Sequence, residues 1–290
     1  MSADVAQAGR AVATTTPAPP ASQTHDLRPV LERVGLHQSV AVLPAHLDRA
    51  SREELSYADF LQGLLEEEAT ARAAAQVQRH MREAGFPFAA TIEQFDFRFR
   101  PDLKRQVVLR YLDATFVEQA RSLALVGAPG LGKTMLAICV ATKQVQLGYT
   151  ARFVTAQHLA NQLGRATTAV GRQRLLTPLL ACDVLVLDEL GYLPTSPAFG
   201  PALYELVAGR YERRPTVLTS NKSLTEWGAI VQDASLAAAI VDRILHHGDV
   251  FYLKGPSYRL KGRSLDGAAP DAPALATMIH TPTTAPAMPA

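Results

Sequence analysis

The stretch LVGAPGLGKTML, residues 125–136, constrains the fold of this chain more than any other part of its sequence. Apolar residues lie on both sides of it, so a glycine-rich loop joins a buried strand to a helix. The spacing from Gly127 to Thr134 matches the pattern G-x-x-x-x-G-K-[S/T]. Such a loop turns backbone N–H groups and the positive end of a helix dipole toward an anion. A phosphate-binding loop is therefore predicted, with a simple structural turn as the alternative.

The last two residues of this loop carry the most specific chemistry. We expect the Lys133 ammonium to reach the β and γ phosphates of a nucleotide, and the Thr134 hydroxyl to bind Mg²⁺. The predicted nucleotide-binding residues are Gly127, Ala128, Pro129, Gly130, Leu131, Gly132, Lys133 and Thr134.

The apolar run VLVLDE ends in two adjacent carboxylates, Asp188 and Glu189. Open α/β sheets bind their ligands at the carboxyl ends of parallel strands, which is the position of this pair. We expect Asp188 to bind Mg²⁺ together with Thr134, and Glu189 to act as the base that activates water. Because phosphate transfer seldom needs the second acid, the pair predicts a Mg²⁺-dependent hydrolase.

A further strand, in TVLTSNKSL, also ends in polar residues. The amide of Asn221 is expected to sense the γ phosphate and orient the attacking water, with a strand-ending asparagine cap as the alternative. GTPases read guanine with N-K-x-D, but here Asn221, Lys222 and Ser223 are followed by Leu224. The carboxylate that would pair with guanine is missing, which favours ATP.

Strands alternate with helical segments from Arg121 onward. The apolar runs lie at residues 122–126, 151–155, 184–188, 216–220 and 250–253. This alternation predicts an α/β domain with a parallel sheet that is covered on both faces. Before it, the spacing predicts a long helix between Ser56 and Gly85, which is either an interaction arm or a packing helix. A second helix is predicted over residues 102–120.

Composition limits the reading of the rest of the chain. Residues 1–25 and 267–290 are rich in Ala, Pro and Thr without periodicity, which is typical of disorder. Cys139 and Cys182 stand in apolar surroundings, so we expect buried free thiols and a reducing, cytoplasmic location. The apolar runs fall short of the roughly 20 residues of a spanning helix, and we expect neither a membrane anchor nor an export signal.

Positive charge is concentrated in the central region. Residues 95–263 carry 21 Lys and Arg against 13 Asp and Glu, a balance found in phosphate-backbone binders but also on solvated surfaces. The segment NQLGRATTAVGRQRLL contains Arg165, Arg172 and Arg174 and no acidic residue. We predict that these arginines contact DNA phosphates without sequence preference, with a solvated helix face as the alternative.

Taken together, the motifs resemble the IstB-like helper ATPases of insertion-sequence transposition, relatives of the DnaC-type helicase loaders within the AAA+ superfamily. The resemblance runs from about Leu55 to Arg263. It rests on LVGAPGLGKT, DVLVLDELGYLP, YELVAGRYERRPTVLTSN, WGAIVQDASLAAAIVDRILHHGDV and GPSYRLK. The loop APGLGKT departs mildly from the family, in which a second proline or a threonine form is more usual.

This resemblance implies an AAA+ P-loop fold with sheet order 5-1-4-3-2, ATP as the nucleotide, and self-association into an ATP-dependent oligomer. It also implies sequence-independent binding of duplex DNA and stimulation of an IstA-type transposase. Arg243 matches the segment that carries a trans-acting arginine finger, so it joins Glu189 and Asn221 as a catalytic candidate. Arg259 is a candidate second sensor. A surface ion pair is the alternative for both arginines.

The domain prediction follows from these observations. Residues 1–50 are a disordered or weakly ordered tail, 51–90 a small helical interaction arm, 91–263 the AAA+ ATPase domain, and 264–290 a disordered tail. The predicted function is an ATP-dependent transposition helper. A replicative helicase loader is the alternative, because both would share the ATPase site; GYLP after the acidic pair and RYERRPTVLTSN favour the helper.

Overall fold

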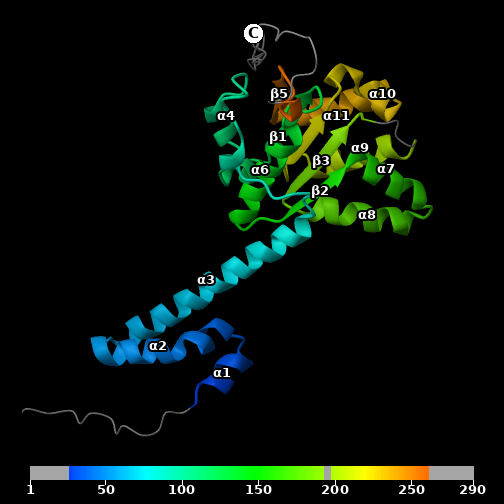
Figure 1. Cartoon of the computed structure of the whole chain (residues 1–290). Helices are drawn as coiled ribbons and strands as arrows, with labels where there is room; N and C mark the ends of the chain where they lie inside the picture. The colour runs from blue at the N-terminus through cyan, green and yellow to red at the C-terminus, as the bar shows by residue number, and fades with distance from the viewer. Residues whose placement is uncertain (1–25, 193–196, 261–290) are drawn as a thin grey trace, which may run out of the picture. The chain divides into compact units, whose positions relative to one another are not determined.

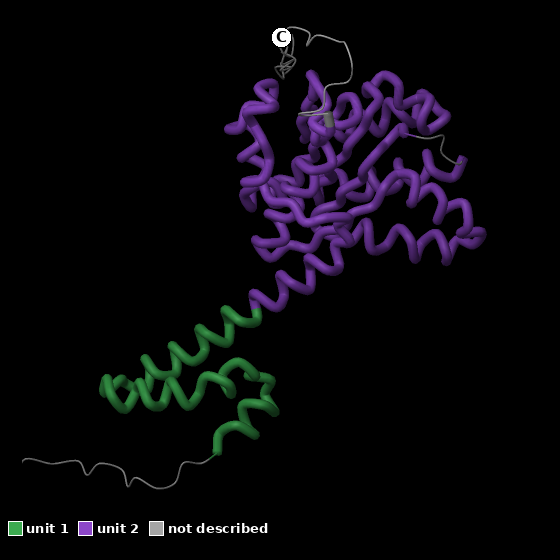
Figure 2. The backbone as a smooth tube through the Cα atoms, in the orientation of Figure 1, with its two compact units in different colours: residues 1–72 green, residues 73–290 purple. Residues whose placement is uncertain are grey.

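The computed structural model describes residues 26–192 and 197–260. The chain divides into two compact units, residues 1–72 and residues 73–290, which we call the helical unit and the sheet unit (Figure 2). The tail expected over residues 264–290, and residues 1–25 of the other expected tail, lie outside the described residues.

Five parallel strands form the central layer of the sheet unit (Figure 1). They are β1 (Ser122–Gly127), β2 (Ala151–Thr155), β3 (Val184–Leu190), β4 (Thr216–Ser220) and β5 (Gly248–Leu253). Their order across the sheet is β2-β3-β4-β1-β5. Read from the other edge, this confirms the predicted order 5-1-4-3-2. The strand that leads into the glycine-rich loop, β1, therefore lies between β4 and β5.

Helices surround this sheet and build the helical unit. The α-helices in the described residues are α1 (Arg28–Arg33), α2 (His37–Glu53), α3 (Tyr57–Ala84), α4 (Arg105–Leu109), α5 (Thr115–Glu118), α6 (Lys133–Gln146), α7 (Ala156–Arg165), α8 (Ala169–Ala181), α9 (Phe199–Arg210), α10 (Trp227–Val231) and α11 (Ala234–His246). Short 3-10 turns are η1 (Ile92–Gln94), η2 (Leu224–Glu226) and η3 (Tyr258–Leu260). None of the helices in this part of the chain is both long and apolar enough to span a bilayer.

Both faces of the sheet are buried. Along β3, Val184 and Val186 pack into a core with α6, whereas Leu185 and Leu187 pack on the other face with α7 and α9. Successive side chains of a strand point to opposite faces, so two-sided burial requires a continuous apolar sequence. The sheet unit also encloses Cys139 and Cys182 as buried free thiols, as predicted.

The predicted long helix is present as α3, which contributes to both units. Ser56 caps its start, because the Ser56 hydroxyl accepts a hydrogen bond from the Asp59 N–H at 3.2 Å. The prediction of one helix over residues 102–120 is wrong. Gln144 of α6 donates to the carbonyls of Tyr111 and Asp113, at 3.0 and 2.9 Å, which pins the chain between α4 and α5 as a turn.

The tail predicted as disordered or weakly ordered over residues 1–50 is instead largely helical from residue 28 onward, where α1 and most of α2 lie. The helical pattern of α2 is weak, because Ser39 and Leu43 are its buried residues and Pro44 stands inside it. A helix with so narrow an apolar stripe is hard to distinguish from a polar tail by sequence alone.

A buried carboxylate joins α2 to α3 within the helical unit. Glu68 accepts hydrogen bonds from the Ser39 N–H at 2.7 Å and from the Arg72 guanidinium at 2.9 Å. Arg72 in turn donates to the carbonyl of Gly35 at 2.6 Å. The backbone hydrogen bond from Ser39 is the main reason why the pKa of Glu68 is lowered from its ordinary value. Glu68, on α3, thus provides the hydrogen-bond acceptor for the Ser39 N–H in the first turn of α2.

We expect Glu68→Gln to speed the hydrogen exchange of backbone amides in α2 and in residues 57–72, because the amide cannot replace a carboxylate that accepts from both partners. Because folding lowers the pKa of Glu68, its contribution is present above the ordinary value of 4.5 and is lost as the pH falls through the lower folded value.

Hydrogen exchange measured by mass spectrometry on the full chain at neutral pH and at acid pH checks this expectation. Glu53→Gln is the matched control, because Glu53 forms an exposed ion pair with Arg49 and should change little. Equal exchange rates in the Glu68 and Glu53 variants at neutral pH would contradict the role given to Glu68.

Candidate functional site

The glycine-rich loop between β1 and α6 has room for glycine alone at its first position. Gly127 has φ of +153°, and a Cβ there would lie 2.3 Å from the carbonyl oxygen of Leu253 in β5. Gly132, the cap of α6, has φ of +88°, a left-handed conformation that favours glycine. At Gly127 the backbone of the loop therefore lies directly against the backbone of β5, and at Gly132 the loop enters α6 through a left-handed turn.

Lys133 lies against the loop that precedes it. Its Nζ donates to the carbonyls of Gly127 and Ala128, both at 2.7 Å, and the side chain is mostly buried. Desolvation is the main cause of the lowered pKa of Lys133, and the nearby Asp188 carboxylate opposes that shift. The ammonium is thus held at the mouth of the loop by two neutral carbonyls, which are weak partners for a charge.

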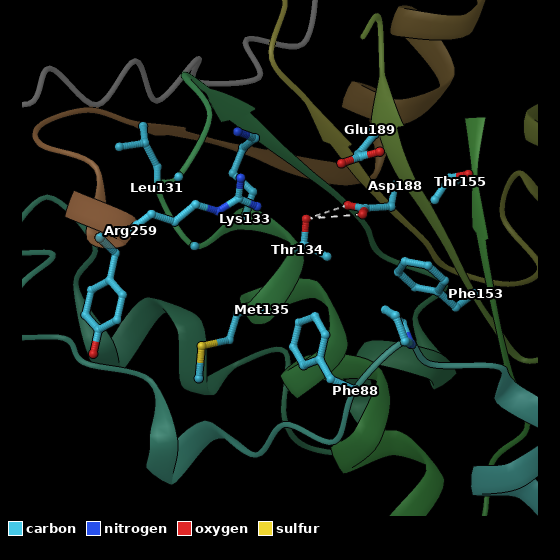
Figure 3. A pocket seen from close by; sticks show the side chains of 14 residues that line it. Phe88, Leu131, Lys133, Thr134, Met135, Phe153, Thr155, Asp188, Glu189 and Arg259 are labelled. Carbon is cyan, nitrogen blue, oxygen red and sulfur yellow. Dashed lines mark hydrogen bonds between the residues drawn. The ribbon is translucent and has the colours of Figure 1, made fainter. Parts of the chain in front are cut away.

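Two hydroxyl groups donate hydrogen bonds to the carboxylate of Asp188. The Thr134 hydroxyl, which follows β1, donates to Asp188 Oδ1 at 2.9 Å, as the dashed line in Figure 3 shows. The Thr219 hydroxyl, on β4, donates to the same carboxylate. Thr155, at the end of β2, is paired in register with Asp188. Asp188 is 3% exposed, so these contacts replace water around the carboxylate.

A bulge in β3 separates the directions of the two acidic side chains. Leu187 pairs with Leu218 and Leu190 with Ser220, so β3 holds one residue more than β4 between these pairs. At this bulge the backbone of Glu189, a non-glycine residue, adopts the strained left-handed conformation with φ of +60°. Its N–H donates to the Thr219 hydroxyl at 2.9 Å. Asp188 consequently stays buried while Glu189 is exposed beside the cavity.

Lys133, Thr134, Asp188 and Glu189 line one cavity of about 500 Å³. Its polar wall is formed by the loop from Gly130 to Thr134 and by Asp188, Glu189 and Arg259. Pro87, Phe88, Met135 and Phe153 form an apolar wall, and Figure 3 shows Phe88 and Met135 on the side of Thr134 away from Glu189. The cavity can therefore hold an anion at one end and a flat apolar group at the other.

Two predicted catalytic residues are not part of this cavity wall. Asn221 follows β4 at the same edge of the sheet, and its buried Oδ1 accepts no hydrogen bond from the described residues. Arg243 of α11 donates to the carbonyl of Ala239 at 2.9 Å and lies over the ring of Tyr204 at 5.0 Å. Arg259, the candidate second sensor, does line the cavity.

The three predicted DNA contacts differ from one another in their surroundings. Arg165 ends α7 and Arg174 lies on α8, and both are exposed. Arg172 forms an ion pair with Glu205 of α9, at 3.0 Å. The segment lacks acidic residues of its own, but α9 supplies one to it. Of the three arginines, Arg165 and Arg174 therefore form no ion pair with another described residue.

Sequence reasoning missed Thr219 and the apolar wall. Thr219 stood in the polar strand end TVLTSN, but its partners are set by the bulge in β3, which no local pattern reveals. Phe88 and Phe153 lie 65 positions apart in the sequence, so only folding brings them together at the cavity.

Comparison with known proteins finds similarity to ATP-binding proteins, which agrees with a cavity beside a glycine-rich loop. The family model described as IstB-like ATP binding protein matches residues 30–266. The chain is 39% identical to the insertion sequence IS5376 putative ATP-binding protein of Geobacillus stearothermophilus, over 76% of this chain and 88% of that protein. It is 36% identical to the insertion sequence IS21 putative ATP-binding protein of Pseudomonas aeruginosa, over 84% of this chain and 92% of that protein.

Solved structures of similar fold include the DnaC helicase loader, with a TM-score of 0.44 and 23% identity over 51% of this chain and 87% of that chain. DnaA from Aquifex aeolicus bound to AMPPCP is similar with a TM-score of 0.47 and 16% identity, over 61% of this chain and 54% of that chain. The sheet order and the glycine-rich loop are those of the AAA+ P-loop fold predicted from the sequence.

We expect Thr219→Val to lower the free energy of unfolding by about 1–3 kcal/mol, because it leaves the Glu189 N–H without its partner and removes one of the two hydroxyls that donate to the Asp188 carboxylate. Thermal or urea denaturation of the full chain measures the change. Thr142→Val is the matched control: Thr142 is 4% exposed and its hydroxyl has no partner among the described residues. That change should be neutral or stabilising, and equal destabilisation by both would contradict the network around Asp188.

Proposed function

Because the chain belongs to the IstB-like ATP binding protein family, we propose that it binds and hydrolyses ATP to drive a DNA-binding step of insertion-sequence transposition. The observation that carries this proposal is the convergence of Lys133, Thr134, Asp188 and Glu189 on one cavity. A cation for phosphate, two oxygens for a metal ion and a carboxylate for water are the groups that nucleotide hydrolysis needs.

Thr134 and Asp188 have the chemistry of a Mg²⁺ site. Both offer oxygen ligands, which Mg²⁺ prefers, and their oxygens lie 2.9 Å apart. The buried Asp188 carboxylate accepts hydrogen bonds from the hydroxyls of Thr134 and Thr219, which are neutral groups and supply no positive charge. A bound Mg²⁺ would supply that positive charge and would polarise the phosphate oxygens.

Lys133 and Glu189 would divide the remaining chemistry between them. The Lys133 ammonium would exchange the carbonyls of Gly127 and Ala128 for oxygens of the β and γ phosphates, which are charged acceptors. Glu189 would take a proton from water as the water oxygen bonds to the γ phosphorus and the bond from that phosphorus to the β-phosphate oxygen breaks. Asn221, whose Oδ1 accepts no hydrogen bond from another described residue, would orient this water.

The apolar wall supports a purine at the other end of the cavity. Phe88, Met135 and Phe153 offer apolar and aromatic surface to a flat ring. Lys222, the lysine of the incomplete guanine motif, instead forms an exposed ion pair with Glu226 at 3.2 Å. These contacts support ATP over GTP as the substrate.

Arg243 would act on ATP bound to another copy of the chain. Its guanidinium lies over Tyr204 on α9 and is not part of this chain's own cavity wall. A finger that serves the γ phosphate would therefore come from a neighbour in an oligomer, which is the role that we propose for it. Self-association would then be a condition for rapid hydrolysis.

Duplex DNA and a transposase are the proposed partners. The relatives are named as insertion sequence proteins, which supports the transposition helper over the helicase loader. Arg165 and Arg174 offer exposed cations on α7 and α8 for phosphate contacts that read no sequence. Thr155 links this surface to the cavity, because its hydroxyl caps α7 through the His158 N–H at 3.1 Å.

We expect Glu189→Gln to bind ATP with parental affinity but to lower the turnover number by about 100-fold or more, because the amide keeps the shape and loses the base. Steady-state phosphate release and equilibrium ATP binding measure the two effects. Glu118→Gln, an exposed change on α5, is the control and should leave both unchanged. Parental turnover in the Glu189 variant would remove the water-activating role from this residue.

Replacing Arg165, Arg172 and Arg174 together by Gln should weaken the binding of unrelated duplexes equally. The salt dependence of binding should flatten by roughly one unit for each arginine that contacts a phosphate. Duplex affinity measured against salt concentration for two unrelated sequences checks this. Lys104, Arg105 and Arg110 changed together to Gln remove the same charge near α4, and an equal loss in that control would place the DNA surface elsewhere.

A further inference from the structure

Arg100 is a buried guanidinium beneath the glycine-rich loop. The residue is 2% exposed and lies in residues 85–104, the segment between α3 and α4. Its Nε donates to the carbonyl of Leu131 at 3.0 Å, Nη1 to the carbonyl of Lys254 at 3.2 Å, and Nη2 to that of Pro256 at 2.7 Å. A buried cation bound to neutral carbonyls is costly, so these three hydrogen bonds must be kept for the guanidinium to stay buried.

The hydrogen bond to Leu131 fixes the direction of a peptide plane in the loop. In a trans peptide the N–H of the next residue points opposite to the carbonyl. Since Arg100 holds the Leu131 carbonyl, the N–H of Gly132 points away from the guanidinium. The described peptide bonds include no cis bond, and Gly132 lines the cavity. Arg100 therefore turns one loop donor toward the side where the anion would lie.

A second peptide plane of the loop is held in the same way. The Tyr258 N–H donates to the carbonyl of Gly130 at 2.8 Å, so the N–H of Leu131 points away from Tyr258. Neither the Leu131 N–H nor the Gly132 N–H donates to another of the described residues. Contacts from residues outside the loop thus orient the adjacent N–H groups of Leu131 and Gly132, and both groups are available to one ligand.

Arg100 also holds the segment that brings Arg259 to the cavity. Its contacts with the carbonyls of Lys254 and Pro256 fix the chain directly after β5. Tyr258 and Arg259 follow within three residues, and both line the cavity. One guanidinium therefore sets the Gly132 N–H on one side and holds the segment that carries Arg259 on the other.

We propose that Arg100 is a positioning residue for the phosphates of the nucleotide, acting through the Leu131–Gly132 peptide and through the segment that carries Arg259. The proposal rests on the proposed function, since it concerns the same ATP site. Arg100 does not touch the phosphates. It sets the direction of the groups that do. Its loss should therefore weaken the binding of a ligand more strongly when the ligand carries more phosphates.

Arg210 provides a matched comparison within the sheet unit. It is also 2% exposed, and it donates to the carbonyls of Cys182 and Pro215 at 2.7 and 2.6 Å. These carbonyls precede β3 and β4, at the opposite ends of the strands from the cavity. Removal of Arg210 should therefore destabilise the fold without changing the direction of a loop donor.

The experiment compares Arg100→Met, Arg100→Lys and Arg210→Met with the parental full chain. Binding of ATP and of adenosine is measured by competition with a fluorescent ATP analogue, at a temperature well below each melting midpoint. We expect Arg100→Met to weaken ATP binding by about tenfold or more while adenosine binding changes by less than about twofold. Arg100→Lys should recover part of the ATP affinity, and Arg210→Met should lower the melting temperature with both affinities retained.

Parental ATP affinity in folded Arg100→Met, or an equal loss for ATP and adenosine, would overturn the positioning role. If Arg100→Met does not fold, the same comparison is made with Arg100→Lys, whose single ammonium cannot keep all three contacts. A parental chain that fails to bind ATP would contradict the proposed function instead, so the two failures are distinguishable.

Discussion

The carboxylate of Asp188 is the constraint on which the rest of the site depends. It is buried at the end of β3, a strand covered on both faces, and a charge in such a place must be satisfied by fixed partners. Hydroxyls from Thr134 and Thr219 supply these partners, so the ends of β1, β3 and β4 have to meet at one point. The parallel order of the sheet makes that meeting possible. The bulge that exposes Glu189 also depends on Thr219.

Local patterns predicted the parts of this arrangement that neighbouring residues determine. The loop from Gly127 to Thr134, the apolar β3 and the long α3 are each visible in a short window of sequence. The strand order came from the family resemblance, because spacing alone does not say which strands are neighbours. The assignment of Asn221 and Arg243 to catalysis stays a prediction, since neither lines the cavity of this chain.

Long-range contacts account for what the sequence did not reveal. The helix expected over residues 102–120 is interrupted because Gln144, from another helix, takes two of its carbonyls. The helices α1 and α2 lie where a tail was expected, and Glu68 of α3 holds the start of α2. Arg172 is paired with Glu205 from α9. Each of these partners lies more than 25 positions away, beyond the reach of a periodic pattern.

The central claim is that the loop from Gly127 to Thr134 holds the phosphates of ATP while Thr134 and Asp188 hold the metal ion. A crystal structure of the chain with a non-hydrolysable ATP analogue and Mn²⁺, with anomalous scattering recorded for manganese, tests it most directly. The account predicts the β and γ phosphates beside Lys133, the manganese peak next to the Thr134 hydroxyl on the side of Asp188, and the purine against Phe88. Phosphates bound away from the loop, or a manganese peak remote from Thr134 and Asp188, would contradict it.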